Sequence, residues 1–509
     1  MLTPRYLIGF TGHRSGYDEN LIRPALAQAL TDLKARAAAL GGTADLYASV
    51  AEGCDTLCVE IALGLDMAAH LLLPLPQDEF AKDFSTPEIW ERSRRQIELA
   101  LQKPGRDSLR VVPGEMTRPD CYFDQGIQIL EAVDVLVAVW DGEPARGPGG
   151  TAQVIAHAQK LGLPVVVIDS KTGQSRIVGD LSGAFASDAI LAELQYIAQK
   201  AGTACASQSG TADDLQKCLD GIANTEAKRF RPSLLVIILL HGIAALLAAI
   251  VTFKVAEEYA KDSLWEHWKW VFTATELLLV SYALWLSIRL HRRHTQERWI
   301  RCRFACELVR GLRASVPLVD PLNPSVGLHD PKWRRFALSV GLLVNERRAT
   351  LQPSALRDHY ISTRLSESHE EGQIGHYLKM KPTAMRWWNT TGFVSKWSAQ
   401  LAPGFVLLSL INKVFHLGYQ KPFGGWVVVT LLPIALPLLA GVASGIRHAL
   451  DAGRRKERYP EMAARLAALR THLTGLETRA TIAHTVSQTE EILLDELREW
   501  QLTATTTGH

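Results

Sequence analysis

Three glycine-containing loops carry residue types that suit the binding of an anionic ligand. The first, Thr11-Gly12-His13-Arg14, offers a hydroxyl group, an open backbone and two side chains that can donate to an anion. The second, residues 51–55, contains Glu52, Gly53 for a tight turn, and Asp55, which can cap a helix or accept from a sugar hydroxyl. In the third, Asp141 is followed by Gly149-Gly150-Thr151, which lead directly into a helical stretch, and a helix N-terminus binds phosphate well.

The apolar pattern of residues 5–170 places these loops at one edge of a sheet. Short apolar runs alternate with helical stretches, which predicts an α/β domain with a parallel sheet covered on both faces. We expect strands at 5–10, 44–50, 70–76, 109–113, 133–141 and 164–169, and helices at 21–40, 56–63, 87–101 and 151–161. In such a sheet, ligands bind at the carboxyl ends of the strands.

The candidate site therefore combines all three loops. The expected ligand-binding residues are Thr11, Gly12, His13, Arg14, Glu52, Gly53, Asp55, Asp141, Gly149, Gly150 and Thr151. Together they favour a phosphate-bearing ligand, although a single glycine loop is more often only a turn. The alternative is a degenerate pocket that serves as a dimerisation module.

Two long apolar runs predict a first transmembrane hairpin. Residues 232–253 contain no Lys, Arg, Asp or Glu and are long enough to cross the hydrocarbon core as a helix, and residues 270–288 form a second span. Basic residues precede and follow this pair, at 228–231 and 289–294. By the positive-inside rule, both ends of the hairpin lie in the cytoplasm.

A second hairpin is expected near the C-terminus. Residues 422–446 carry no charged side chain, whereas the partner span at 393–411 is weaker because Pro403-Gly404 interrupts it. Arg447 and the basic residues at 454–456 again follow the apolar run. Four spans with both termini cytoplasmic is the consistent count, and it predicts a multi-pass protein of the inner (plasma) membrane.

Two ionisable residues fall inside the first hairpin. His241 lies about 14 Å and Glu276 about 20 Å from the expected cytoplasmic face, at roughly 1.5 Å per helical residue. Charged groups at such depth are costly and usually functional, so the two residues are candidate groups of a membrane pathway. The alternatives are a protonated Glu276 or a pair that only fixes helix packing.

These patterns divide the chain into six segments. A ligand-binding domain is expected at 1–170, a linker with a local helix at 171–228, and the first hairpin with a cytosolic helix at 229–315. The remaining segments are a mixed cytosolic one at 316–390, the second hairpin at 391–448 and C-terminal helices at 449–509. Leucines at helical spacing in the last segment suit intramolecular packing, or less often oligomerisation.

The composition excludes two classes of site. Lys and Arg total 55 against 53 Asp and Glu, so there is no basic excess of the kind that a nucleic-acid-binding protein shows. The seven Cys lie far from zinc-knuckle spacing, and the pair Cys302 and Cys306 would need further soft ligands to hold a metal. We therefore expect no metal and no cofactor other than a nucleotide-derived ligand.

The motifs at 11–14, 51–57, 73–84 and 136–158 together resemble the SLOG superfamily, to which DprA-type and LOG-type proteins also belong. That resemblance implies a Rossmann-like fold that senses or processes a nucleotide derivative. The first hairpin and the helix 297–313 are similar to SLATT domains, two-transmembrane effectors that accompany SLOG sensors in bacterial nucleotide-dependent defence. Enzymes of the LOG type carry a catalytic Glu after the glycine loop and Thr, whereas this chain has Gln153.

An amide cannot act as a carboxylate acid or base, so ligand sensing is favoured over hydrolysis and no catalytic residue is assigned. The leading hypothesis is a membrane effector, expected to form a homo-oligomer in the lipid bilayer, whose ligand changes the packing, assembly or permeability of the spans in bacterial defence or stress signalling. A membrane-tethered nucleotide-processing enzyme of the nucleosidase or phosphoribohydrolase type, using Glu52 or Asp141, is the second. A passive membrane scaffold is the third.

Overall fold

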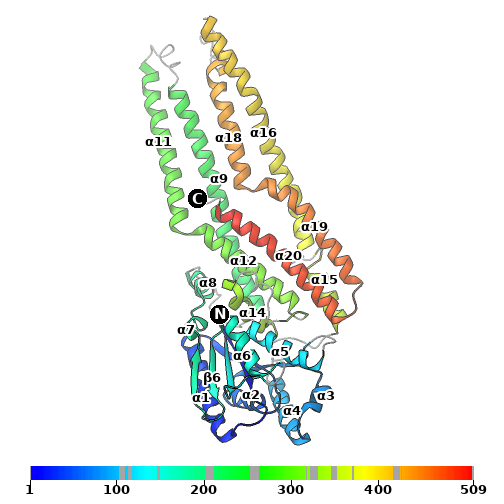
Figure 1. Ribbon diagram of the computed structural model, residues 1–509. Helices are drawn as coiled ribbons and strands as arrows, with labels where there is room; N and C mark the ends of the chain where they lie inside the picture. The colour runs from blue at the N-terminus through cyan, green and yellow to red at the C-terminus, as the bar shows by residue number, and fades with distance from the viewer. Residues whose placement is uncertain are drawn as a thin grey trace. The chain divides into compact units, whose positions relative to one another are not determined.

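The computed structural model divides the chain into two compact units (Figure 1). The first, here called the sheet unit, comprises Met1–Cys218, Glu307–Pro353 and Val486–Leu494. The second, the helical unit, comprises Leu219–Cys306, Ser354–Thr485 and Asp495–His509. The structure describes residues 2–102, 109–112, 117–145, 149–200, 211–252, 263–316, 318–320, 322, 331–345, 352–368, 372–415, 425 and 427–506.

A seven-stranded sheet with the order β4-β3-β2-β1-β5-β6-β7 forms the centre of the sheet unit. Its strands are β1 (Arg5–Gly12), β2 (Thr43–Ala48), β3 (Ala68–Leu73), β4 (Leu109–Val111), β5 (Val135–Trp140), β6 (Val165–Asp169) and β7 (Ser175–Val178). The six expected strands are confirmed and pair in parallel, as their continuous apolar runs indicate. Strand order reverses between β1 and β5, which places a topological switch point there.

Helices cover both faces of the sheet. On one face pack α1 (Glu19–Ala39), α2 (Cys54–Gly64) and α4 (Pro87–Gln102), after the short α3 (Gln77–Phe80) and the 3₁₀ turn η1 (Ala81–Asp83). On the other lie α5 (Arg118–Ala132) and α6 (Thr151–Lys160). Leu26 and Leu30 of α1 are fully buried against this sheet, and each such side chain stabilises the fold by about 1.5–3 kcal/mol.

A helix from the distant middle of the chain completes the second face. Helix α14 (Pro331–Asn345) buries Leu338 and Leu342 in one cluster with Leu7 of β1 and Tyr47 of β2. The Arg5 backbone N–H, at the start of β1, donates to Ser339 Oγ of α14 at 3.0 Å. Part of the segment that the sequence suggested as a separate cytosolic region therefore belongs to the core of the sheet unit.

Buried charge fixes α14 to the amino-terminal edge of the sheet. The Asp134 carboxylate, 7% exposed, accepts from the Leu7 backbone N–H at 2.8 Å. It also accepts from Arg334 at 3.0 Å and from Arg335 at 3.3 Å. The Arg335 guanidinium lies over the Tyr6 ring at 4.2 Å from its centroid. Asp134 is thus satisfied by two arginines that lie 200 residues further along the chain.

The segment after β6 belongs to the same unit. The antiparallel strand β7 was not expected, because its sequence reads as part of a polar linker. It is followed by α7 (Leu181–Ala184) and α8 (Ala189–Lys200), and the latter matches the helix expected within residues 171–228. Phe185 stacks on Tyr6 with ring centroids 5.2 Å apart, so this segment packs on the start of β1.

The helical unit contains the apolar runs. Helices α9 (Ala212–Thr252), α11 (Ser263–Arg292), α16 (Gln373–Phe415) and α18 (Leu432–Ala449), the last preceded by the π-helical turn η3 (Val427–Leu431), include four candidate spans long and apolar enough to cross a membrane. The other helices among the described residues are α12 (Thr295–Ser315), α15 (Pro353–Thr363), α19 (Ala452–Thr474) and α20 (Arg479–Thr506). Four apolar helices agree with the count expected from the sequence.

Their bounds differ from the apolar runs. Helix α9 begins about twenty residues before the first run, because the polar residues that precede it are also good helix formers. Helix α16 continues through Pro403, the residue that interrupts its apolar run in the sequence. Proline is tolerated inside a long apolar helix when neighbouring groups satisfy the freed carbonyl.

Close helix packing in this unit uses glycine. Helix α16 packs along α18 and α19, and the first two run side by side in Figure 1. A Cβ atom at Gly242 of α9 would lie 2.7 Å from Val442 of α18, so these two helices approach closely. The outer faces remain apolar and exposed, with Leu278 of α11 at 69% and Phe393 of α16 at 65%. Such faces require a partner that is itself apolar.

Candidate functional site

Backbone contact joins the loops that follow β1 and β2. The Cys54 N–H, at the first turn of α2, donates to the His13 carbonyl at 3.0 Å. Gly53 has φ +96°, and a Cβ atom there would lie 2.4 Å from the Arg14 carbonyl oxygen. A Cβ atom at Gly12 would lie 2.5 Å from Cys54 Cβ. Both glycines are thus required by close approach, as well as by the turn at Gly53.

His13 links the two sides of the topological switch point. Its Nε2 accepts from the backbone N–H of Asp141, the residue after β5, at 3.0 Å. The same nitrogen lies 3.2 Å from Asp141 Oδ1. The first contact requires an unprotonated Nε2 and the second a protonated one, so the His13 tautomer decides which of them forms. The loops after β1 and β5 therefore meet through one imidazole.

Asp55 is a buried acid at the N-terminus of α2. Its Oδ1 is buried and has no hydrogen-bond partner in the described part of the chain. Burial raises the pKa of the Asp55 carboxyl to about 7, although the Arg14 guanidinium and the Gly12 backbone amide act in the opposite direction. The carboxyl group is consequently divided between its neutral and charged forms at neutral pH.

Arg14 presents a positive charge to solvent at the same edge. Its guanidinium lies over the Tyr122 ring of α5, 4.9 Å from the centroid. Among the residues that the structure describes, no carboxylate forms an ion pair with Arg14. The Tyr122 hydroxyl donates to Asp83 Oδ2 at 2.7 Å, so the ring that supports Arg14 is itself fixed. An exposed arginine held in this way is available to an anion.

The glycine loop before α6 packs against the same tyrosine. A Cβ atom at Gly149, where φ is +77°, would lie 3.1 Å from Tyr122 Cβ. Gly150 is the N-cap of α6, and its carbonyl accepts from the Gln153 N–H. The Gln153 side chain reaches back and accepts from the Gly149 N–H at 2.9 Å. Gln153 therefore shapes the loop in the manner of a capping box.

The Glu52 carboxylate is engaged by a neighbouring loop and is not directed at the proposed ligand. Its two carboxylate oxygens accept from Ser85, one from the backbone N–H at 2.9 Å and one from the hydroxyl at 2.6 Å. Ser85 lies in the loop between η1 and α4. Glu52 thus orders a neighbouring loop. The other expected residues lie at the ends of β1 and β5 and at the starts of α2 and α6: Thr11, Gly12, His13, Arg14, Asp55, Asp141, Gly149, Gly150 and Thr151.

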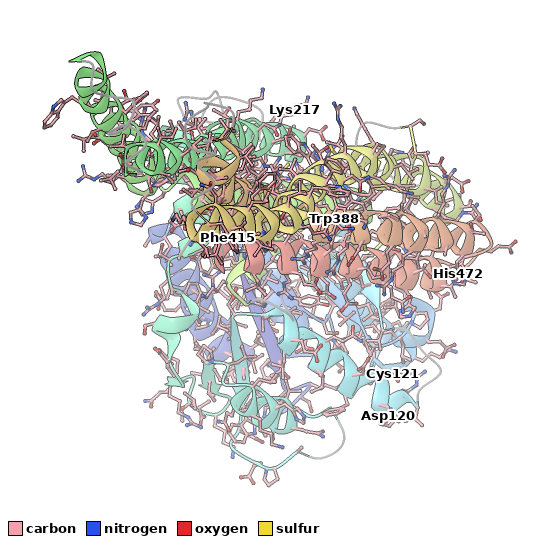
Figure 2. The ribbon with its side chains drawn as sticks, turned by 90° about the horizontal axis from the view of Figure 1, so that it is seen from above. Asp120, Cys121, Lys217, Trp388, Phe415 and His472 are labelled. Atoms are coloured by element: carbon pink, nitrogen blue, oxygen red, sulfur yellow. The ribbon has the colours of Figure 1, made fainter. Side chains whose placement is uncertain are left out.

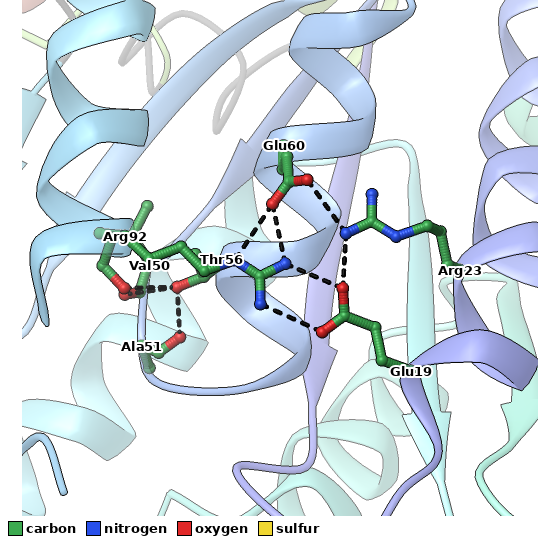
Figure 3. A network of polar contacts seen from close by, with 8 residues as sticks. Glu19, Arg23, Val50, Ala51, Thr56, Glu60 and Arg92 are labelled. Atoms are coloured by element: carbon green, nitrogen blue, oxygen red, sulfur yellow. Dashed lines mark hydrogen bonds and ion pairs between the residues drawn. The ribbon is translucent and has the colours of Figure 1, made fainter. Parts of the chain in front are cut away.

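An ion-pair network beside this edge was not anticipated (Figure 3). Arg92 of α4 bonds Glu19 of α1 and Glu60 of α2, and Arg23 of α1 bonds both carboxylates as well. Hydrogen bonding from Arg92, followed by that from Arg23, lowers the pKa of Glu19 to about 2. The three helices of one face are tied together close to where the loops emerge.

Part of the ion-pair network could be predicted from the sequence, whereas the role of Tyr122 could not. Glu19 and Arg23 show the i, i+4 spacing of a helical ion pair, which was a usable signal for half of the network. Tyr122 gave none, because its role depends on the direction of a ring from another helix.

The two polar residues of the apolar helices belong to the helical unit, whereas this site belongs to the sheet unit. His241 is exposed, and its Nδ1 contacts the Ile237 carbonyl at 2.8 Å within α9. Glu276 is half-buried on α11. Within the described ranges, no hydrogen bond or ion pair joins the two residues.

Metal binding has little support in this part of the chain. The described residues contain no group of three His, Cys, Asp or Glu side chains arranged to hold a metal ion. Cys302 and Cys306 are both buried, and the Cys306 thiol points to Asp220 Oδ1 at 3.8 Å.

Comparison of the chain with protein-family models, with curated proteins and with solved structures gave no match.

Proposed function

We propose that this protein is a membrane-anchored effector whose sheet unit binds a nucleotide-derived ligand and thereby changes the packing, assembly or permeability of its apolar helices. In this proposal the sheet unit is a Rossmann-like domain of the SLOG type and the apolar helices form SLATT-like spans of the plasma membrane. Both termini face the cytoplasm. The physical requirement is that the ligand binds one arrangement of the spans more tightly than another.

The observation that carries the proposal is the place of α14. This helix lies in the chain between α11 and α16, and it forms part of the core under β1 and β2. A change in the sheet unit that shifts β1 must therefore act on a segment that is covalently continuous with both apolar hairpins. A domain attached to its membrane anchor by one flexible linker would have no such connection.

The ligand side of the proposal depends on the switch point. The crevice outside the carboxyl ends of β1 and β5 is where open parallel sheets bind ligands. There, the exposed Arg14 charge and the α6 N-terminus suit a phosphate, and the buried Asp55 carboxyl suits a sugar hydroxyl. A phosphate joined to a sugar is the chemistry of a nucleotide derivative.

The enzyme alternative has weaker support. Gln153 occupies the place of the carboxylate that LOG-type enzymes use, and its amide is engaged by the Gly149 N–H. Glu52 is held by Ser85, and Asp141 lies against His13. Both carboxylates that the enzyme alternative invokes are thus engaged by protein groups, which disfavours them as the general acid or base of a hydrolysis.

The test uses the full-length protein in detergent, because the sheet unit includes residues 307–353. Calorimetric titration with ADP-ribose and a panel of nucleotides should give saturable binding for at least one compound. Arg14→Gln should weaken it by at least about tenfold, the usual effect of losing a charge-assisted contact to phosphate. Arg36→Gln removes an exposed charge from α1 in the same unit and is the matched control.

Two results would count against sensing. Absence of binding across the whole panel would remove the ligand, and equal losses for the Arg14 and Arg36 variants would remove the assigned site. Chromatography of the incubated nucleotides separates the enzyme alternative, because only hydrolysis releases free base or sugar phosphate.

A further inference from the structure

A cationic cluster lies where the apolar runs of α16 and α18 end. Arg447 follows the last apolar residues of α18, and Trp388 precedes those of α16. The two ends are adjacent, because a Cβ atom at Gly392 of α16 would lie 3.5 Å from Arg447 Nη2. Trp388 is labelled on α16 in Figure 2. If these helices cross a membrane, this level is that of the lipid headgroups.

Two cations share the Trp388 ring. Arg447 Cζ lies 4.8 Å from the ring centroid, and Lys456 Nζ of α19 lies 4.9 Å from it. A Cβ atom at Gly453 would lie 2.9 Å from Trp388 Cζ3, so α19 is pressed against the indole. The ring is thereby fixed between two helices, and both positive charges are held within 5 Å of its centre.

These two cations have no anionic partner in the described part of the chain. No Asp or Glu there forms an ion pair with Arg447 or Lys456, including Asp451, which lies between them in sequence. Arg447 Nε is buried and makes no hydrogen bond among these residues. Two like charges held close together repel each other, and a bound anion would remove that cost.

Two arginines of α19 near Lys456 each have a carboxylate partner. Arg454 and Arg458 of α19 both bond the Glu499 carboxylate of α20, with 2.9 Å between Arg454 Nη2 and Glu499 Oε2. Hydrogen bonding from Arg458 lowers the pKa of Glu499, which keeps this partner ionised. Arg454 and Arg458 thus have an anionic partner, whereas Arg447 and Lys456 have none among the described residues.

The surroundings indicate which anion fits. Trp387, next to Trp388 in sequence, is 43% exposed. Exposed tryptophans next to basic residues mark the interface between hydrocarbon and headgroups. We propose that Trp388, Arg447 and Lys456 form a binding site for the phosphate of an anionic phospholipid, with the guanidinium as the hydrogen-bond donor and the ammonium as a second charge.

This inference rests on the proposed membrane-spanning role of α16 and α18, and its test reads lipid binding separately from membrane insertion. Full-length protein in neutral detergent is titrated with short-chain phosphatidylglycerol and, in parallel, with short-chain phosphatidylcholine. The wild type should prefer the anionic lipid by about tenfold, because two nearby basic residues favour it and repel the choline cation.

Matched double variants give the decisive comparison. Arg447→Gln with Lys456→Gln should abolish the preference for phosphatidylglycerol. Arg454→Gln with Arg458→Gln removes the same total charge from the Glu499 pairs and should retain the preference. Equal loss in both doubles would show a diffuse electrostatic effect, and retention in the first double would also overturn the site. Thermal unfolding of each variant establishes that it is folded.

Two further arms separate the sources of phosphate and the two proposals. An excess of inorganic phosphate or ADP should leave lipid binding unchanged, and displacement by either would assign the site to a soluble anion. Alkaline extraction of cell membranes tests insertion alone. Release of the wild type into the aqueous fraction would contradict the membrane proposal, whatever the titration in detergent shows.

Discussion

At the scale of single residues, Asp55 is the group whose charge is set most clearly by its surroundings. Burial raises the pKa of its carboxyl to about 7, so ionisation above that pH places a negative charge close to Arg14 and, in the proposed complex, close to the ligand phosphate. ADP-ribose should therefore bind more weakly as pH rises from 6 to 8, because its two esterified phosphates do not titrate in that range. A calorimetric pH series measures this trend.

The Asp55→Asn variant is the control for that trend. It keeps the shape of the side chain and cannot ionise, so its affinity should vary less with pH than that of the wild type. The two proteins differ only at this side chain, so a difference between their pH profiles reports on Asp55. Parallel pH profiles for the two proteins would show that the Asp55 carboxyl does not govern binding.

Gly53 is the residue at which the backbone leaves least freedom. Gly53→Ala forces a Cβ atom to within 2.4 Å of the Arg14 carbonyl at φ +96°, so it should cost at least about 2 kcal/mol of stability. Gly64→Ala, in the same helix, meets nothing within 4 Å and should be neutral or stabilising by about 0.5–1 kcal/mol. Denaturant unfolding measures both variants, and similar values for the two would refute the assigned strain.

Residue types and spacing predicted the glycine loops, because a glycine at a strand end allows a tight turn or a close approach of the backbone. They did not predict that Glu52 binds Ser85 or that Tyr122 supports Arg14. Those contacts depend on which loop or helix lies opposite, and that is decided by packing between segments far apart in the sequence.

At the scale of elements, the network of Glu19, Arg23, Glu60 and Arg92 connects α1, α2 and α4. Arg92→Gln should destabilise the sheet unit by about 1 kcal/mol, since Arg92 and Glu19 are each more than one-third exposed and solvent screens their interaction. Glu91→Gln, which disturbs only an exposed pair with Arg94, should change stability by less than about 0.5 kcal/mol.

The same network gives a pH signature. The pKa of Glu19 is lowered to about 2, so its stabilising effect is complete above about 4.5 and is lost as pH falls towards 2. Arg92→Gln should flatten this loss, which thermal unfolding at pH 6, 4 and 3 would reveal. An unchanged acid profile would mean that Glu19 does not owe its low pKa to Arg92.

Helix α14 makes the strongest element-scale prediction. Leu338→Ala opens a cavity under β1 and β2 and should cost about 2–4 kcal/mol, whereas Leu161→Ala, at a site 54% exposed, should cost less than about 0.5 kcal/mol. Hydrogen exchange should show the loss in β1, although the substitution lies more than 300 residues away in sequence. Protection that falls only around residues 331–345 would contradict the core role of α14.

The packing of α14 against the sheet could not be predicted from the sequence pattern. Its amphipathic sequence predicts a helix, but it gives no indication of which surface the helix covers. The parallel strands were readable because each is a short continuous apolar run between helical stretches. A helix that returns to β1 after the first apolar hairpin is a long-range pairing that no local periodicity records.

At the scale of the whole molecule, composition decided what was predictable. Four apolar helices follow from long runs that contain few charged side chains, since no water-exposed fold tolerates such length without covering it. The arrangement of their polar residues does not follow, because it depends on which helices lie beside them. His241 and Glu276 belong to this second category.

A substitution at Glu276 tests whether the apolar helices line a water-filled pathway. A half-buried carboxylate in an apolar run, with no partner in the described ranges, is costly in lipid unless water or a second copy of the chain meets it. Glu276→Gln should therefore reduce ligand-triggered dye release from proteoliposomes by at least about tenfold while insertion is unchanged. Glu297→Gln, on the exposed start of α12, is the control and should retain release. Wild-type release from the Glu276 variant would mean that the carboxylate serves helix packing alone, and the effector would then act by assembly without a polar path through its spans.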